Sequence, residues 1–265
     1  VHVIPITTLM RWQDFLYDDR LRTIDEAIVD TQTALPIQRT RRSYHTSGDG
    51  NGLLASLTQI DQANPANNKT TQYTYDSAGR VIKTHDLSML GACQASFTAY
   101  DEAGNTRVSF CTPRASTASV AAGSDPEAYY FGQYVNGDDK LTIHQYDTLG
   151  RRISVKELRQ KNTTIQNSVW IETLTFYDAL DRVVRTISNY ANQSGGAAED
   201  PALWVWDVTD GRWEKPGGSP ISHGADNTQN AIADTAFNAR GMVRLTRDTI
   251  GNVTLYGYND AGRLI

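Results

Sequence analysis

Apolar and polar residues alternate along much of the chain with a period of two, which is typical of β-strands. In residues 141–146, leucine, isoleucine and glutamine fall on one face, and threonine, histidine and tyrosine on the other. Residues 169–176 alternate in the same way but carry apolar residues on both faces. The pattern predicts two strands here, the second partly buried on each face.

The first 35 residues give a less regular pattern. Leu9, Trp12 and Leu16, followed by Ile24 and Ile28, match the apolar stripe of a helix that a pair of aspartates interrupts. A pair of irregular strands fits the same residues nearly as well. Both alternatives stay open for this region.

A short motif recurs along the chain: an aromatic residue, Asp or Asn, two further residues, Gly, and then often Arg and an apolar residue. The clearest copies read Tyr-Asp-x-x-Gly-Arg, one has Asp in place of Gly, and one lacks the aromatic residue. The seven copies begin at Tyr75, Tyr100, Tyr146, Tyr177, Phe237, Arg247 and Tyr258. Tyr17-Asp18 followed by Leu21 has the pattern of a degraded early copy.

Each part of the motif has a physical role in a turn. The aromatic residue is expected to end an incoming strand, where its ring packs on the sheet. The Asp or Asn side chain can accept a hydrogen bond from the backbone N–H two residues on. Glycine supplies a positive φ without steric hindrance, and Asp181, which replaces it in one copy, tolerates that region better than most residues. The motif therefore predicts β-hairpins with loops longer than two residues.

The spacing of the motifs supports this interpretation. The first four copies stand 25, 46 and 31 residues apart, and the last two aromatic copies stand 21 apart. A step near 20 fits two strands and two turns, so the longer steps must contain insertions. Two are predicted near 113–134 and 188–235, as loops or excursions, the second with a strand of its own around 203–206.

The repeated Tyr-Asp-x-x-Gly-Arg motif with a step near 20 resembles the YD or Rhs repeat. That family includes bacterial Rhs proteins, the shell-forming subunits of insecticidal toxin complexes and the extracellular part of teneurins. The resemblance covers roughly residues 70 to 265. It implies an all-β fold in which consecutive antiparallel hairpins form a curved sheet, part of a larger spiral β-shell. In the toxin proteins of the family, the shell encloses a C-terminal effector.

The resemblance also implies a division of the chain. Residues 1–69 would be the N-terminal part of the repeat sheet or an irregular lead-in, and residues 70–265 would be repeat hairpins with the two insertions. A strand that has just begun with Arg-Leu-Ile at the last residues leaves half a hairpin, so we expect a fragment of a longer chain. The family's self-cleaving region has no match here, and no protease residue is carried over.

Composition narrows the classes of function. Lys and Arg number 25 against 30 Asp and Glu, a net charge of −5, whereas a protein that neutralises nucleic-acid phosphates shows the opposite balance. No run of about 18 apolar residues is present, so no membrane span is expected in this segment. The five histidines are scattered without metal-ligand spacing, and no metal site is expected.

Several residues suggest chemistry, but each has a simpler explanation. The motif aspartates recur at one turn position, which favours a structural role over paired-carboxylate catalysis. The glycine-rich segment 48–52 lacks the lysine of a phosphate loop, so a hairpin turn is favoured over nucleotide or Ca²⁺ binding. Arg39, Arg41 and Arg42 fit a solvated strand face better than a nucleic-acid site.

The two cysteines bracket the motif at Tyr100. If its loop runs from Asp101 to Gly104, the numbers of paired strand residues sum to about 205, and Cys93 and Cys111 sum to 204. A cross-strand disulfide is therefore expected, against the alternative of two separate buried thiols. Such a bond would indicate an oxidising compartment.

Two functions of different classes follow. The first is a non-catalytic structural segment of a secreted or cell-surface YD/Rhs-repeat β-shell that encloses or displays an effector. The alternative is an extracellular filament, sheath or adhesion module that binds carbohydrate or neighbouring cells. Tryptophans 204, 206 and 213 could stack on a sugar there, or form a satellite core beneath a loop.

An enzyme is not expected, and no catalytic, cofactor-binding or metal-binding residue and no cofactor is assigned. The expected partners are the remainder of the protein's own chain and an enclosed C-terminal effector or neighbouring subunits. Nucleic acid is not expected as a partner.

Overall fold

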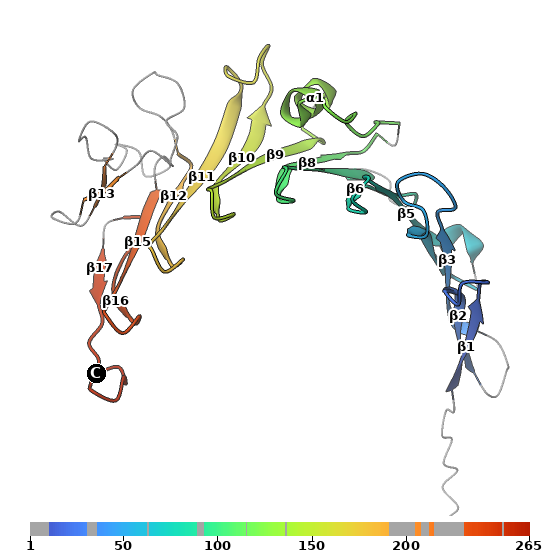
Figure 1. The fold of residues 1–265 in the computed structure, drawn as a ribbon, viewed down its shortest axis with the longest axis horizontal. Helices are drawn as coiled ribbons and strands as arrows, with labels where there is room; N and C mark the ends of the chain where they lie inside the picture. Colours follow the sequence, from blue (N-terminus) through green and yellow to red (C-terminus); the bar gives the residue numbers. More distant parts are fainter. Residues whose placement is uncertain are drawn as a thin grey trace, which may run out of the picture. The chain divides into compact units, whose positions relative to one another are not determined.

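The computed structural model describes residues 11–30, 36–62, 64–88, 93–114, 116–135, 137–190, 205–207, 212–214, 231–250 and 252–265. Within them, fifteen strands hydrogen-bond in chain order as one antiparallel sheet, and two further strands form a small sheet of their own. In Figure 1 the strands therefore follow one another in the order of the sequence colours. The predicted all-β fold of consecutive antiparallel hairpins is confirmed.

The first elements of the chain are β1 (Arg11–Tyr17), β2 (Thr23–Asp30), β3 (Pro36–Tyr44), β4 (Leu54–Ile60), the 3-10 turn η1 (Pro65–Asn67), β5 (Lys69–Tyr75), β6 (Val81–Asp86), β7 (Ala95–Tyr100), β8 (Thr106–Thr112) and the helix α1 (Pro126–Gln133). The remaining ones are β9 (Lys140–Tyr146), β10 (Arg152–Gln160), β11 (Val169–Tyr177), β12 (Val183–Ser188), β13 (Val205–Asp207), β14 (Arg212–Glu214), β15 (Ala231–Phe237), β16 (Val243–Arg247) and β17 (Val253–Leu255).

The chain forms two compact units. The first consists of residues 1–99 and 109–140, and the second of residues 100–108 and 141–265. The division at residue 69, which the sequence suggests, stays a prediction.

The motif aromatic residues end their strands, as predicted. Tyr75, Tyr100, Tyr146, Tyr177 and Phe237 are the last residues of β5, β7, β9, β11 and β15. In several of these hairpins the register shifts at the aromatic residue, which forms a β-bulge, as between Thr74 and Tyr75. A bulge sharpens the local twist and aims the ring away from the regular row of side chains.

The N-terminal region is made of strands rather than a helix. β1 and β2 pair antiparallel, with Tyr17 opposite Thr23. The helical alternative is therefore wrong over residues 11–30. The backbone N–H and C=O groups form hydrogen bonds between strands here, whereas in a helix they would bond within the segment. Residues 1–10, with Leu9, lie outside the described part of the chain.

The first insertion contains a helix, which the prediction of a loop missed. The Asp125 side chain caps α1 by accepting a hydrogen bond from the Glu127 backbone, and Pro126 occupies the first helical turn. Tyr130 of α1 packs against Phe97 and Phe110, with ring centroids 5.6 and 5.2 Å away. These three side chains are almost fully buried, so α1 covers one face of the β7–β8 hairpin (Figure 1).

The second unit has its own core. Its buried apolar side chains are Leu174, Phe176, Ile187, Tyr190 and Ile232. Leu141 and Ile143 of β9 are also buried, whereas the neighbouring Thr142 and His144 are only half-buried, which confirms the predicted alternation.

The second insertion ends earlier than predicted. The large sheet resumes with β15 at Ala231, since Ala231 to Asp234 pair with β12. β13 and β14 form the small separate sheet, in which Trp206 is opposite Trp213. Of the strand expected around 203–206, the first two residues lie outside the described part of the chain.

Candidate functional site

The motif forms the same group of contacts at the hairpin ends. We define the turn clasp as five consecutive residues. The first is an Asp or Asn, the fourth lies three positions on, and the fifth lies four positions on. At Asp178, one carboxylate oxygen accepts hydrogen bonds from the backbone N–H of Leu180 at 2.9 Å and of Arg182 at 3.0 Å. The other oxygen accepts from Arg182 Nε at 2.7 Å. The Asp178 backbone N–H donates to the Arg182 carbonyl at 2.9 Å, so the loop is closed by backbone and side chain together.

The same backbone bond between the first and fifth residues recurs at seven more turns, with N···O distances of 2.8 to 3.0 Å. These clasps begin at Asp18, Asp76, Asp101, Asp147, Asn238, Asp248 and Asn259. The degraded copy at Asp18 thus forms a full clasp. The predicted bond from the N–H two residues on is confirmed at Ala78, Leu149 and Leu180, and the bond from the N–H four residues on was missed.

The fourth residue of the clasp has a left-handed backbone wherever the structure describes it. Gly79, Gly104, Gly150, Gly241 and Gly262 have φ between 75 and 90°, Leu21 has 60° and Asp181 has 61°. A side chain in this conformation costs about 1–2 kcal/mol per residue. Because Leu21 adopts it all the same, the hydrogen bonds of the clasp, rather than glycine alone, fix the turn.

The clasp keeps its carboxylate ionised. Burial raises the pKa of Asp147 and Asp178, but hydrogen bonds from the backbone and from Arg151 and Arg182 outweigh it, and the pKa of both groups is lowered. At Asp18 the side-chain hydrogen bond from Arg22 is the largest effect and lowers the pKa. An ionised, fully bonded carboxylate is suited to holding a turn and is a poor general base.

Clasps also contact the next hairpin along the sheet, through what we call the repeat contact. The guanidinium of Arg22 lies over the ring of Tyr44 at 4.1 Å from its centroid. The Tyr44 hydroxyl in turn donates to the carbonyl of Thr23, the residue after the arginine, at 3.0 Å. The two hairpins are thus joined in both directions.

The second unit repeats this geometry. Arg151 lies over the Tyr177 ring at 4.9 Å, and the Tyr177 hydroxyl donates to the Arg152 carbonyl at 3.0 Å. Arg182 lies over the Phe237 ring at 4.2 Å, where no hydroxyl is available. Sequence reasoning assigned the aromatic ring to sheet packing and missed its contact with the arginine of the preceding motif.

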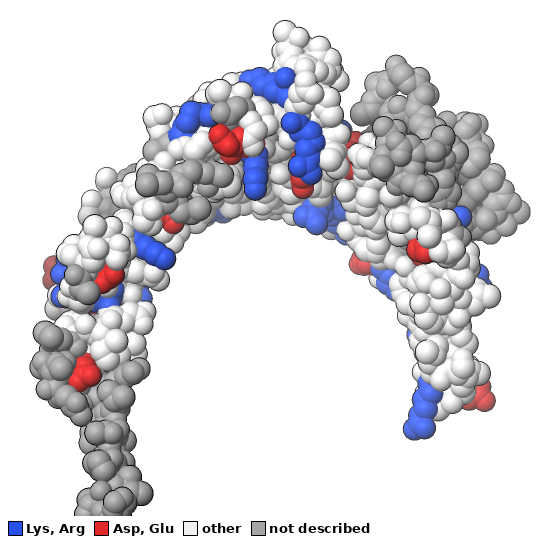
Figure 2. Space-filling view, turned by 180° about the vertical axis from the view of Figure 1, so that it is seen from behind, with Lys and Arg blue, Asp and Glu red and all other residues white. Residues whose placement is uncertain are grey.

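The basic residues predicted as a strand face are neutralised by the neighbouring strand. Arg39 and Arg41 form ion pairs with Asp25 at 2.7 and 3.1 Å, and Arg42 pairs with Glu26 at 2.9 Å. On the face drawn in Figure 2, positive and negative side chains are interspersed rather than gathered by sign. The interpretation as a nucleic-acid site receives no support from this arrangement.

The glycine-rich segment 48–52 is the turn between β3 and β4. Gly48 and Gly52 have positive φ, and Gly50 is buried against two rings. A Cβ on Gly50 would lie 2.9 Å from ring carbons of His45 and of Tyr75, so only glycine fits. Among the described residues, no group of three or more His, Cys, Asp or Glu side chains is placed to hold a metal ion.

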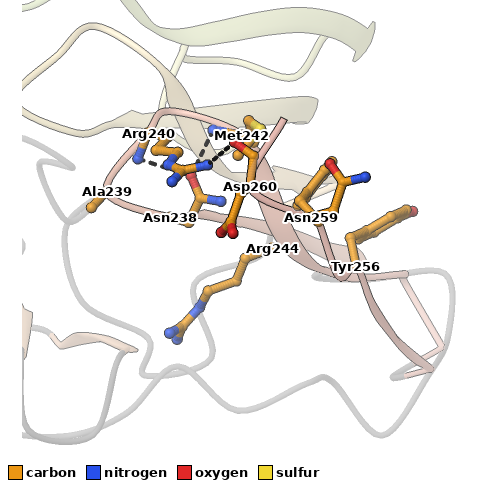
Figure 3. Close-up of a pocket in the computed structure, with 9 residues that line it drawn as sticks. Asn238, Ala239, Arg240, Met242, Arg244, Tyr256, Asn259 and Asp260 are labelled. Atoms are coloured by element: carbon orange, nitrogen blue, oxygen red, sulfur yellow. Dashed lines mark hydrogen bonds between the residues drawn. The ribbon is translucent and has the colours of Figure 1, made fainter. Parts of the chain in front are cut away.

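A recess of about 440 Å³ lies between the clasps at Asn238 and Asn259 (Figure 3). Arg240 of one turn donates to the backbone carbonyl of Asp260 in the other at 3.0 Å and joins the two. Arg244, Tyr256 and Tyr258 complete much of the wall. No sequence pattern marks this recess, because its residues come from two turns, from β16 and from the chain after β17, which only the fold brings together.

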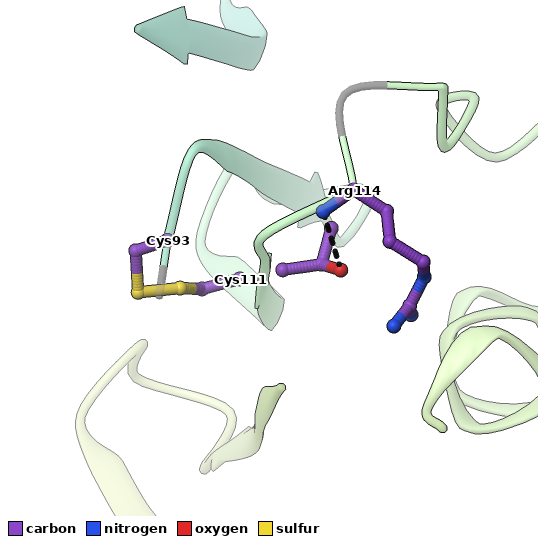
Figure 4. Close-up of a disulfide and its surroundings, with 4 residues drawn as sticks. Cys93, Cys111 and Arg114 are labelled. Carbon is purple, nitrogen blue, oxygen red and sulfur yellow. Dashed lines mark hydrogen bonds between the residues drawn. A yellow bond between two sulfur atoms is a disulfide. The ribbon is translucent and has the colours of Figure 1, made fainter. Parts of the chain in front are cut away.

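The two cysteines form the expected disulfide, with Cα atoms 4.9 Å apart (Figure 4). Cys111 lies in β8, whereas Cys93 precedes β7 by two residues and has φ of 67°. The bond therefore joins β8 to the connection that enters β7. Next to it, Thr112 Oγ1 accepts from the Arg114 backbone N–H at 3.2 Å, at the start of the insertion that contains α1.

No protein-family model matches the chain, and no curated protein matches it. Among solved structures, a crystal structure of TcdB2-TccC3-Cdc42 is similar with a TM-score of 0.43 and 14% sequence identity over 96% of this chain. A structure of the Photorhabdus luminescens Tc holotoxin pore is similar with a TM-score of 0.29 and 15% identity over 95%. The chain spans 13% and 14% of the length of those two chains. In the described part of this chain, no helix is long and apolar enough to cross a membrane.

Proposed function

We propose that the chain is a non-catalytic structural segment of a secreted or cell-surface YD/Rhs-repeat β-shell that encloses or displays an effector. The observation that carries the proposal is the repeat contact. An arginine held by its own clasp covers the ring of the next hairpin, and a tyrosine hydroxyl bonds back to the preceding one. The motif residues are therefore used in joining each hairpin to its neighbour.

Such a linkage suits a continuous wall. A single hairpin is marginally stable in water, and an open strand edge is a site of unwanted pairing. In a linear array, stability comes from each unit and from its interface with the next one. The repeat contact supplies an interface at the hairpin ends, in addition to the hydrogen bonds between strands.

The disulfide supports the proposed location. Disulfides persist in secreted and cell-surface proteins, and thiols are kept reduced in the cytosol. The bond between Cys93 and Cys111 is consistent with an oxidising compartment.

Limited proteolysis of the full-length natural polypeptide tests the proposal, with mass spectrometry of the surviving fragments. We expect a segment outside residues 1–265 to survive in the native protein and to be cut only at urea concentrations that unfold the clasped strands. Replacing both Asp147 and Asp178 with alanine should lower that urea concentration. The matched control is Glu102→Ala, at an exposed turn residue outside the bonds of its clasp.

Equal cleavage of every outside segment in the native and unfolded protein would contradict enclosure. If those segments are cut freely while residues 1–265 resist, the alternative of an extracellular filament, sheath or adhesion module is favoured instead.

A further inference from the structure

The disulfide combines two features that make a disulfide easy to reduce. Cys93 has φ of 67°, in the left-handed region that residues other than glycine avoid. Both Cys93 and Cys111 are only half-buried, so a reductant can reach their sulfur atoms. Disulfides that are strained or exposed are reduced more readily than relaxed, buried ones.

Opening of the bond lets Cys93 leave this conformation. The left-handed region is disfavoured roughly 5- to 30-fold for a residue with a side chain. Relaxation of Cys93 therefore shifts the equilibrium toward the two thiols by up to that factor. The backbone that relaxes leads directly into β7, which begins two residues later.

Cys111 lies between two residues of β8 that hold α1 on the sheet. Phe110 and Thr112 lie on the opposite face of the strand from Cys111, and both are buried. The Phe110 ring packs on Tyr130 of α1, with the ring centroids 5.2 Å apart. The Thr112 hydroxyl forms a hydrogen bond with Asp139, a short way beyond the helix. The disulfide and α1 thus hold the same strand from opposite faces.

Arg114 links the end of β8 to the end of the helix. Its backbone N–H donates to Thr112 Oγ1, and its guanidinium donates to the carbonyl of Gln133, the last residue of α1, at 2.6 Å. The guanidinium also pairs with Asp139 at 2.9 Å, and the Asp139 side chain is fully buried. Arg114 follows the strand that carries Cys111 (Figure 4). A shift of this strand end therefore disturbs the pairing of a buried charge, which is strongly destabilising.

We propose that the disulfide is a redox switch for α1, opened by a dithiol reductant. One thiolate of the dithiol attacks a sulfur of the bond and forms a mixed disulfide, which the second thiol then resolves. Two electrons and two protons pass to the protein, so Cys93 and Cys111 become thiols and the reductant becomes a disulfide. The end of β8 then moves, and α1 uncovers Phe97 and Phe110, the two rings on which Tyr130 packs.

This switch rests on the secreted or cell-surface location proposed above, since the bond forms in an oxidising compartment. It does not rest on the enclosure of an effector. Its consequence is an apolar surface that is exposed only after the protein meets reducing conditions.

Hydrogen exchange of the full-length protein, followed by mass spectrometry with and without dithiothreitol, tests the proposal. We expect millimolar dithiothreitol to reduce the bond in the folded protein, as shown by alkylation of both thiols. Exchange in α1 should then become roughly tenfold faster, and exchange in β11 and β12 should not change.

The matched control is the double variant Cys93→Ser with Cys111→Ser, in which no bond can form. Its α1 should exchange fast without reductant, and dithiothreitol should cause no further change. Thermal unfolding checks that the variant is folded. If it is not, the oxidised and reduced forms of the unmodified protein still provide the comparison.

Reduction of the bond only in denaturant would overturn the proposal. Reduction in the folded protein that speeds exchange in β7 and β8 but leaves α1 protected would also overturn it, and would make the disulfide a purely structural link. Neither result depends on a segment outside residues 1–265, so a failure here is distinguishable from a failure of enclosure in the proteolysis experiment.

Discussion

Each aspartate of a clasp closes its hairpin because its two carboxylate oxygens bond to different groups. At Asp178, one oxygen bonds to two backbone N–H groups and the other to the guanidinium of Arg182. Asn238 retains the first set of bonds, from the backbone of Arg240 and Met242, and its turn is unchanged in form. The backbone bonds are therefore the part of the clasp that every copy needs.

This distinction leads to a prediction for Asp178. Asp178→Ala should lower the free energy of unfolding by about 1–2 kcal/mol, because it removes all three bonds. Asp178→Asn should cost less than half as much, since the amide oxygen still accepts from the two backbone N–H groups. Urea unfolding of the two variants measures both values. An equal loss in the two would mean that the charge, rather than the backbone bonds, holds the turn.

The fourth position of the clasp gives a second prediction, on two glycines. Gly150 has φ of 79°, and no atom lies within 4 Å of a Cβ added there, so Gly150→Ala should cost about 1–2 kcal/mol through the backbone alone. Gly132 lies in α1 and has equally open space around its Cβ. Gly132→Ala should therefore stabilise the protein by up to about 1 kcal/mol.

Thermal unfolding of the two glycine variants is the measurement. The same methyl group should shift the unfolding temperature down at Gly150 and up at Gly132. Shifts of the same sign would contradict the assignment of the Gly150 effect to its positive φ.

At the scale of hairpins, the strand ends could be predicted from the motif, but the contacts between neighbouring hairpins could not. The aromatic residue and the turn residues are neighbours in the sequence, so their roles could be worked out locally. The contact between Arg151 and Tyr177 joins two motifs, and no local pattern marks it. The helix α1 was missed although Asp125, Pro126 and Glu127 form a helix start, because the insertion was treated as a loop between repeats.

The repeat contact predicts an energetic coupling between Arg182 and Phe237. Arg182→Lys also weakens the clasp at Asp178, so a single variant cannot isolate the stacking on the ring. A double-mutant cycle of Arg182→Lys with Phe237→Leu should give a coupling energy of about 0.5–1 kcal/mol. The same cycle with Arg159→Lys should give a coupling near zero. A zero coupling at Arg182 would remove the energetic basis of the repeat contact.

For the molecule as a whole, two kinds of titrating group set the dependence of stability on pH. Burial lowers the pKa of His85 and of His144, with Lys83 and Arg152 adding to the effect. The unfolded chain then binds more protons than the native protein below about pH 6.5, so stability is lost as the pH falls from there toward the folded pKa. The clasp aspartates also have lowered pKa values, and their contribution is lost below about pH 4.

The free energy of unfolding should therefore fall in two steps between pH 8 and pH 3. Replacing both His85 and His144 with glutamine should remove the step that begins below about pH 6.5 and leave the acidic one. Urea unfolding at a series of pH values measures this profile. A single step below pH 4 in the unmodified protein would contradict the histidine contribution.

The disulfide belongs to the first of the two compact units, and its effect should stay local. The two cysteines are 18 residues apart, and closing a loop of about this length stabilises a fold by about 3 kcal/mol in the chain-entropy model. In an array whose units interact mainly with their neighbours, loss of that stabilisation should spread only a short way along the sheet.

Replacing both Cys93 and Cys111 with alanine should therefore speed hydrogen exchange in β7 and β8. The exchange of β11 and β12, whose core residues belong to the second unit, should stay the same. Hydrogen exchange followed by mass spectrometry resolves these strands, and equal acceleration in all four would show that the sheet unfolds as one cooperative body.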